Sequence, residues 1–186
     1  MILDSLFDNL PLHAVIIIWS IIGIFGLWFF IFILSLSFSI VFKKKIKNTS
    51  STINMLMNQR YDVVVSLINI LKKHNLQISD LDKKAISNLE RVHDFQALSK
   101  DDRDNRVLTF VHSSHNILSI CESSNEVVND EEYAKKLLIF NDTEETYRQK
   151  SALYNSDIIG YNYWVNVRVC KHLLKLFGLK SKDLIV

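Results

Sequence analysis

The sequence has few of the residues that make turns, with one proline and four glycines among its 186 residues. Hairpins, β-bulges and the phosphate loops of dinucleotide-binding folds rely on these residue types, so their scarcity argues against such folds. It favours long helices with few interruptions. The net charge of +2 is likewise too small to indicate a nucleic acid as the partner.

The sequence also lacks the motifs of common catalytic and metal sites. It has no glycine-rich phosphate loop and neither the zinc-protease nor the serine-hydrolase signature. A di-iron bundle needs two Glu-x-x-His motifs, and only one occurs, at residues 90–93. Cys121 and Cys170 match no metal or redox spacing, and His112 and His115 have no neighbouring carboxylate that completes a ligand set. We therefore expect no catalytic residues, no metal and no cofactor.

What the sequence has in abundance is a run of apolar residues near its start. Residues 14–42 contain no charged side chain, and these 29 residues would extend about 43 Å as a helix at about 1.5 Å per residue. A bilayer is crossed by about 20 apolar residues. The leader at 1–13 has two aspartates and no lysine or arginine, unlike a cleaved signal peptide. We expect a transmembrane helix at 14–42 in a single-pass protein of the cell membrane.

A basic juxtamembrane segment at 43–52 follows this run and predicts its orientation. The segment contains four lysines, namely Lys43, Lys44, Lys45 and Lys47. Positively charged flanks stay on the cytoplasmic side, so we expect the N-terminus outside and the chain after the span in the cytoplasm. The same lysines are expected to lie against anionic lipid headgroups.

After the basic segment, apolar residues alternate spacings of four and three, the pattern of a helix that packs along one seam. The first seam contains Arg60 and His74, and the second contains Glu144 and Ser151; these four residues are called the polar seam. The first seam consists of Ile53, Met57, Arg60, Val64, Leu67, Leu71, His74 and Ile78. The second consists of Tyr133, Leu137, Phe140, Glu144, Tyr147, Ser151, Tyr154, Ile158, Tyr161 and Val165.

Two shorter helices are expected between the seams. The first begins at a capping signal at 79–82 and is expected to carry Leu81, Ala85, Leu89 and Val92. After a charged connection at 99–105, the second is expected to bury Val107, Phe110 or Val111, Ile117, and Leu118 or Cys121. A polar loop at 122–130 then ends in an N-cap at Asn129 or Asp130.

These elements predict an all-α fold. An N-terminal transmembrane helix is followed at 53–178 by an antiparallel four-helix bundle with long first and last helices. Residues 179–186 form a C-terminal tail.

The last helix and the tail resemble the LemA family of single-pass bacterial membrane proteins. That family has Thr-Glu, then two Tyr-Asn pairs seven residues apart, then Leu-Phe-Gly before a basic tail. The matching residues here are Thr143-Glu144, Tyr154-Asn155, Tyr161-Asn162 and the tail at 176–182. The blocks at 59–74 and 125–133 are also similar to that family.

The chain departs from the family pattern at several positions. Val65, Val169 and Ser181 stand where the family usually has proline, and Ser151 stands where it has arginine. Residues 144–146 replace its Glu-Asn-Arg run, so any site built on that run is incomplete here. The resemblance implies an antiparallel four-helix bundle on a membrane anchor. It implies no chemistry, because the family has no settled biochemical activity.

The two Tyr-Asn pairs could bind a ligand, or they could be two successive packing positions on one helix. Seven residues turn a helix through about 700°, so both pairs share one face. We expect packing: Tyr154 and Tyr161 lie in the seam, while Asn155 and Asn162 bond to a neighbouring helix or to water.

The basic end of the chain leaves two interpretations open. Phe177 is followed by Gly178, which is expected to cap a helix. This helix end folds onto the bundle, or it is an amphipathic end that touches the inner leaflet of the membrane.

The sequence thus indicates a membrane-anchored, non-enzymatic interaction or scaffold module. Its expected partners are the lipid bilayer and a protein. Ser35 and Ser39 have the spacing that lets membrane helices approach each other, so a homo-oligomer is a further hypothesis. The alternative is a metal-dependent protein or an enzyme with its site in the polar seam.

Overall fold

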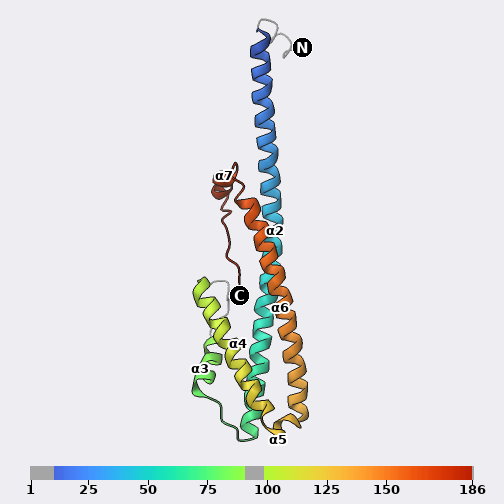
Figure 1. The fold of residues 1–186 in the computed structure, drawn as a ribbon, viewed down its shortest axis with the longest axis vertical. Coiled ribbons are helices and arrows are strands. Elements are labelled where there is room, and N and C mark those ends of the chain that lie inside the picture. Colours follow the sequence, from blue (N-terminus) through green and yellow to red (C-terminus); the bar gives the residue numbers. More distant parts are fainter. Residues whose placement is uncertain (1–10, 91–98, 186) are drawn as a thin grey trace. The chain divides into compact units, whose positions relative to one another are not determined.

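The computed structural model describes residues 11–90 and 99–185, and every regular element in these ranges is a helix (Figure 1). The elements are α2 (Leu12–Lys73), α3 (Asp80–Glu90), α4 (Lys100–Glu122), α5 (Asn125–Val128), α6 (Glu131–Val165) and α7 (Lys171–Leu176). The all-α prediction is confirmed for this part of the chain. Most of the leader, and Val92 and His93 with the Glu-x-x-His motif, lie outside the described residues.

The chain divides into two compact units. The first contains Met1–Lys43 and Ile159–Lys182, and the second contains Lys44–Ile158 and Asp183–Val186. Helices α2 and α6 each contribute residues to both units.

Helix α2 is 62 residues long and runs without a break through the basic segment. No glycine or proline interrupts it between Gly26 and its end. It stops where Asn75 adopts a left-handed conformation (φ 57°) and the Leu76 N–H bonds the Leu71 carbonyl at 2.9 Å. Among the described helices, this one is long and apolar enough to cross a membrane, and its most apolar stretch is not buried within the chain.

In the first unit, the C-terminal residues pack onto the second half of the apolar run. The Trp28 indole N–H donates to the Val169 carbonyl at 3.1 Å, and the rings of Phe32 and Phe177 lie 6.1 Å apart. Phe38 stacks on Trp164 with ring centroids 4.6 Å apart. The seam spacing of four and three therefore continues upstream of Ile53, through Ser50, Ile46, Phe42, Ser39, Ser35, Phe32 and Trp28.

Three small residues of this unit lie in contacts within the chain. Ser35 and Ser39, the candidate helix-association pair, are both fully buried. On α6, a Cβ added to Gly160 would lie 2.7 Å from the ring of Phe42, so only glycine fits beneath this ring as it stands. The candidate pair is thus covered by its own chain, whereas Gly23 and Gly26 have open space around them.

The two predicted seams are buried in the described structure. Along α2 and its continuation, the buried members are Ile53, Met57, Arg60, Val64, Leu67, Leu71 and Ile78. Along α6, they are Tyr133, Phe140, Tyr147, Ser151, Tyr154, Ile158, Tyr161 and Val165. Of the alternatives left open on α4, Phe110 and Cys121 are fully buried.

The predicted face of α3 was wrong at Leu81, which is 80% exposed. Asp82 and Ile86 turn inward instead, at 8% and 3% exposure. Ser79 caps the helix by accepting the Leu81 N–H at 3.2 Å, as expected. Asp82, however, accepts a hydrogen bond from Asn116 on α4 at 3.4 Å rather than closing the capping box. This inward polar contact shifts the buried face by one residue.

Two predicted loops contain helix. The charged stretch 99–105 is largely the first turn of α4, because Ser99 accepts the Asp102 N–H at 3.2 Å as an N-cap. The stretch 122–130 contains α5, a single turn that buries Val127 completely. Its last residue, Asp130, accepts the Glu132 N–H at 2.8 Å, which makes it the cap of α6.

Gly178 ends α7 as predicted. It has a left-handed φ of +72°, and the N–H of the next residue, Leu179, bonds the Leu174 carbonyl at 3.1 Å. Leu174 and Leu179 are buried, whereas Phe177 is 62% exposed.

Candidate functional site

The largest fully buried side chain is a cation, Arg60, which lies in the seam of the second unit and is 1% exposed. Its guanidinium is 2.6 Å from the Glu144 carboxylate and 3.4 Å from the Met57 sulfur. It also lies over two aromatic rings, 4.6 Å from the centroid of Tyr147 and 5.6 Å from that of Phe110. Three helices, α2, α4 and α6, thus meet at one charge.

The electrostatics of this cluster favour a structural role. Burial lowers the pKa of Arg60, and the Glu144 carboxylate opposes this change. Arginine starts so far above neutrality that the guanidinium stays charged. Burial also raises the pKa of the Tyr147 phenol, which therefore stays neutral. Because Glu144 neutralises Arg60 and neither Arg60 nor Tyr147 titrates near neutral pH, we find no free base in this cluster.

His74, the other polar member of the first seam, belongs to a separate cluster. It lies directly after the end of α2 and fourteen residues beyond Arg60, or about 21 Å at about 1.5 Å per residue. Its Nε2 is 3.2 Å from the Asp130 carboxylate, which also accepts from Lys73 at 2.9 Å. Hydrogen bonding by Lys73, the Glu132 N–H and His74 holds the pKa of Asp130 well below its usual range.

The polar seam is therefore not one site. Arg60 and Glu144 are brought together, and Ser151 is buried two turns of α6 beyond Glu144. His74 pairs with Asp130 and, at 3.7 Å, with Glu126. These contacts fix the cap of α6 against the end of α2.

The asparagines of the two Tyr-Asn pairs hold the C-terminal tail, one in each unit. In the first unit, the Asn162 amide donates to the Lys182 carbonyl and accepts from the Lys182 N–H, both at 2.8 Å. In the second, Asn155 bonds the carbonyl and N–H of Ile185 at 2.8 and 2.9 Å. Each amide thereby pairs with both backbone groups of one residue, as a neighbouring β-strand would.

We refer to these two contacts as the asparagine clips. Sequence reasoning placed the tyrosines correctly, since Tyr154 and Tyr161 are 3% and 1% exposed. It expected the asparagines to bond to a helix or to water and missed the tail. The signal was the repeat itself, because two amides on one face of a helix can hold an extended segment that runs alongside it.

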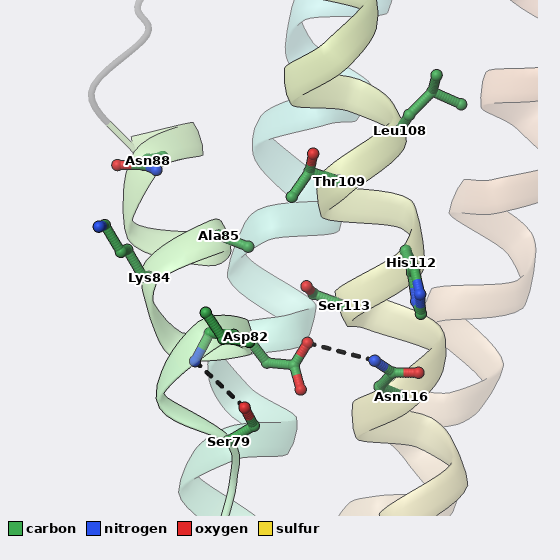
Figure 2. A pocket seen from close by; sticks show the side chains of 11 residues that line it. Ser79, Asp82, Lys84, Ala85, Asn88, Leu108, Thr109, His112, Ser113 and Asn116 are labelled. Atoms are coloured by element: carbon green, nitrogen blue, oxygen red, sulfur yellow. Dashed lines mark hydrogen bonds between the residues drawn. The ribbon is translucent and has the colours of Figure 1, made fainter.

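A cleft of about 720 Å³ lies between α3 and α4 in the second unit (Figure 2). Figure 2 shows the Asp82 carboxylate pointing across it to the Asn116 amide, with His112 further along α4. His112 lines this cleft, whereas the ring of His115 packs edge-on against Phe140 at 6.5 Å. The two histidines thus have different surroundings. Within 11–90 and 99–185, no three His, Cys, Asp or Glu side chains gather as metal ligands.

The basic residues Lys43, Lys44, Lys45 and Lys47 are all exposed on α2, around the buried Ile46. The two cysteines are fully buried and unpaired, and burial raises the pKa of both thiols. These groups add no reactive centre to the clusters above.

No family model, no curated protein and no solved structure matches this chain. What the chain does must therefore be inferred from its own residues.

The buried ion pair gives the first prediction. Replacing Glu144 by Gln leaves Arg60 buried without a counter-charge, and unfolding free energy should fall by about 3 kcal/mol. The double change Arg60→Met with Glu144→Gln should recover most of this loss, because no buried charge remains. Urea unfolding of the full chain in detergent, followed by circular dichroism, measures both. Glu145→Gln is the control, since this neighbour is half exposed and pairs with Arg148 and Gln149. An equal effect there would refute the assignment.

The Asp130 cluster gives a pH-dependent prediction. A carboxylate with a lowered pKa stabilises the fold above its unfolded pKa of about 3.9, and this contribution is lost as pH falls through the folded pKa. Asp130→Asn keeps a capping residue but removes the charge. The variant should be less stable than the wild type at pH 7, and the difference should begin to shrink below about pH 4 and continue to shrink as the folded-state carboxylate is protonated. A difference that is constant from pH 7 to pH 2 in denaturant unfolding would contradict the ion-pair origin.

The asparagine clips give a third prediction. Each hydrogen bond contributes about 1 kcal/mol, so Asn155→Ala should speed hydrogen exchange of the Ile185 amide about tenfold or more. Asn162→Ala should do the same at Lys182. Asn141→Ala, at an exposed position of the same helix, is the control and should leave both amides unchanged. Equal exchange in all three variants, measured by mass spectrometry, would show that the clips do not hold the tail.

Proposed function

We propose that this chain is a single-pass membrane protein of the LemA type whose helical domain is a non-enzymatic interaction or scaffold module. The observation that carries the proposal is how Arg60 and the two asparagines are bound. Arg60 pairs with Glu144 and lies over two rings, and Asn155 and Asn162 bind the tail. These polar groups hold helices and tail together, so recognition falls to the outer surface.

The pairing of residues supports an antiparallel four-helix arrangement. Arg60 on α2 pairs with Glu144 on α6, and Lys73 at the end of α2 pairs with Asp130 at the start of α6, so the two helices run antiparallel. On α3 and α4, Asp82 bonds Asn116 and the Asn88 carbonyl accepts from Arg106, which is again antiparallel. Phe110 brings α4 to the Arg60 cluster.

The LemA assignment is supported by the coupling between its motif blocks. The Tyr-Asn pairs and the basic tail lie far apart in the resemblance, yet Asn155 and Asn162 bind the tail directly. Gly178 supplies the left-handed turn that lets the chain leave α7 for this path. Blocks that contact each other in one structure are stronger support than isolated matches.

The membrane anchor is α2, with the N-terminus outside and the helical domain in the cytoplasm. The uncharged run at 14–42 supports the crossing, and the exposed lysines after it support the orientation. The partner surface would include Leu138 and Ile139 on α6, which are 71% and 48% exposed. The partner is then a protein of the cytoplasm or the membrane, and a second copy is one such candidate.

The alternative of a metal or enzyme site in the polar seam has less support. Arg60 and Glu144 form one cluster, His74 belongs to another, and Ser151 lies two turns of α6 beyond Glu144. The carboxylate of each cluster is bound by a cation of this chain. Metal analysis of the purified full chain tests this alternative directly. One equivalent of bound metal, lost in His74→Ala, would favour it over the scaffold.

The proposed function is tested in intact bacterial membranes. A reporter that is active only in the cytoplasm should work at the C-terminus and fail at the N-terminus, because of the lysines at 43–47. A photo-crosslinking residue in place of the exposed Leu138 should capture a discrete protein adduct. The same residue in place of Leu108, 52% exposed on α4, is the matched control. A reversed reporter pattern would overturn the topology, and identical adducts from both positions, or none, would overturn the α6 surface.

A further inference from the structure

The end of the chain has an unusual combination of charge and exposed apolar surface. Residues 159–182 contain no aspartate or glutamate, and their five basic residues are Arg168, Lys171, Lys175, Lys180 and Lys182. Among these cations lie the exposed apolar side chains of Val169, Leu176 and Phe177, at 55%, 82% and 62% exposure. Single exposed apolar residues are ordinary, but three on one short basic segment call for a partner.

This segment contacts the part of α2 that is expected to lie in lipid. Within the first unit, the Val169 carbonyl accepts from the Trp28 indole at 3.1 Å, and Phe177 lies 6.1 Å from Phe32 between ring centroids. Trp28 itself stacks on Phe32. The exposed apolar residues of the segment are therefore next to two aromatic residues of the apolar run.

The length of the run fixes where these aromatic residues lie. About 20 residues cross the hydrocarbon core, and the run covers 14–42. The first such window is 14–33 and the last is 23–42, so residues 23–33 are inside the core in every placement. Trp28 and Phe32 are both in this shared part. Val169 and Phe177, which touch them, must then lie at the edge of the core or within it.

The charges of the segment favour a hydrocarbon core at about 14–33 over one at 23–42. A core at 23–42 would carry cationic side chains of the segment, such as Lys171 and Lys175, into hydrocarbon, where each is costly. With the core at about 14–33, Phe177 and Leu176 enter its inner edge while the lysines extend to the headgroups. Residues 34–42 are then below the core, where Phe38 stacks on Trp164 and Phe42 covers Gly160.

We propose that residues 167–180 form a second membrane contact, in which Val169, Leu176 and Phe177 enter the cytoplasmic leaflet beside the spanning helix and the basic residues bind anionic lipid headgroups. This inference rests on the proposed function for its membrane anchor. Lipid fits better than a second copy of the chain, because two such segments would repel each other through their unbalanced positive charge. Anionic headgroups complement that charge, and acyl chains complement the apolar side chains.

A consequence concerns the lysines that follow the run. If the core ends near Ile33, Lys43 lies ten residues further, or about 15 Å along the helix. That exceeds the Debye length of about 8 Å at physiological ionic strength. The C-terminal segment, rather than the lysines at 43–47, would then make the closer contact with the headgroups.

The test uses the full chain in nanodiscs with anionic lipid. An environment-sensitive fluorophore is attached at Leu176→Cys, and since Cys121 and Cys170 are fully buried, the introduced thiol reacts selectively in the native state. Its emission should shift to the blue, and lipids with a quencher near the headgroup should remove about half of its intensity. Leu138→Cys, at a similarly exposed leucine in the other unit, is the matched control and should be unaffected.

A third probe separates failure of this inference from failure of the anchor. Ile24→Cys is 68% exposed and lies at the middle of a core at 14–33, so it is read with lipids that carry the quencher near the end of the acyl chain. Quenching at Ile24 but not at Leu176 would overturn the second membrane contact and leave the anchor intact. Absence of quenching at both would overturn the proposed function itself. A blue shift at Leu176 without lipid quenching would mean that protein, such as a second copy, covers the segment, which also overturns the inference.

The charge requirement is tested separately. Changing Lys171, Lys175 and Lys180 to Gln should abolish the difference in Leu176 quenching between anionic and zwitterionic discs. The same change at Lys72, Lys84 and Lys135 in the other unit should preserve it. Equal quenching in anionic and zwitterionic discs for the unchanged chain would refute headgroup binding.

Discussion

The structure depends on one seam, the row of residues spaced by four and three along α2. In an ordinary bundle helix, apolar residues form such a row and polar residues occupy the other positions. The pattern therefore also shows which face is exposed to solvent. In α2 the same row continues into a run with no charged residue, where the opposite face is apolar as well. Trp28, Ser35 and Phe42 keep the row, although nothing in the composition around them reveals it. A single helix thus serves two surroundings, water and the proposed lipid, with one packing rule.

Specificity along the seam comes from its polar members rather than from its apolar ones. Leucine and isoleucine at neighbouring rungs would tolerate a shift of one heptad, because each rung offers a similar hole. Arg60 does not tolerate it, since its charge must meet Glu144 and its guanidinium face must meet the rings of Tyr147 and Phe110. A buried ion pair adds little net stability, but the unpaired charge in a shifted register is strongly unfavourable. The pair therefore sets the register of α2 against α6 in the second unit.

The sequence predicted the helices that are amphipathic over many turns and failed where polar side chains turn inward. Most positions of both long seams were predicted correctly, although His74, Leu137 and Glu144 are only half-buried, because eight to ten positions with one spacing leave little freedom. On α3, eleven residues leave more freedom, and the rule that apolar residues face inward chose Leu81 over Asp82. The Asn116 amide, far away in the sequence, reverses that choice. The charged start of α4 was likewise taken for a loop, since a capped first turn has the composition of one.

At the candidate site, too, the sequence did not show contacts between distant parts of the chain. The spacing that put Tyr154 and Tyr161 in the seam is local, so the sequence predicted it directly. What Asn155 and Asn162 bind is a backbone, and a backbone N–H and carbonyl leave no trace in side-chain composition. The clips therefore became visible only when α6 and the tail were placed together. The side chains at the two clipped positions make contacts of their own, since Ile185 is buried and the Lys182 ammonium lies over the ring of Tyr161. The clips therefore fix the chain directly after the segment that is proposed to reach the membrane, and this segment keeps its exposed lysines and apolar side chains.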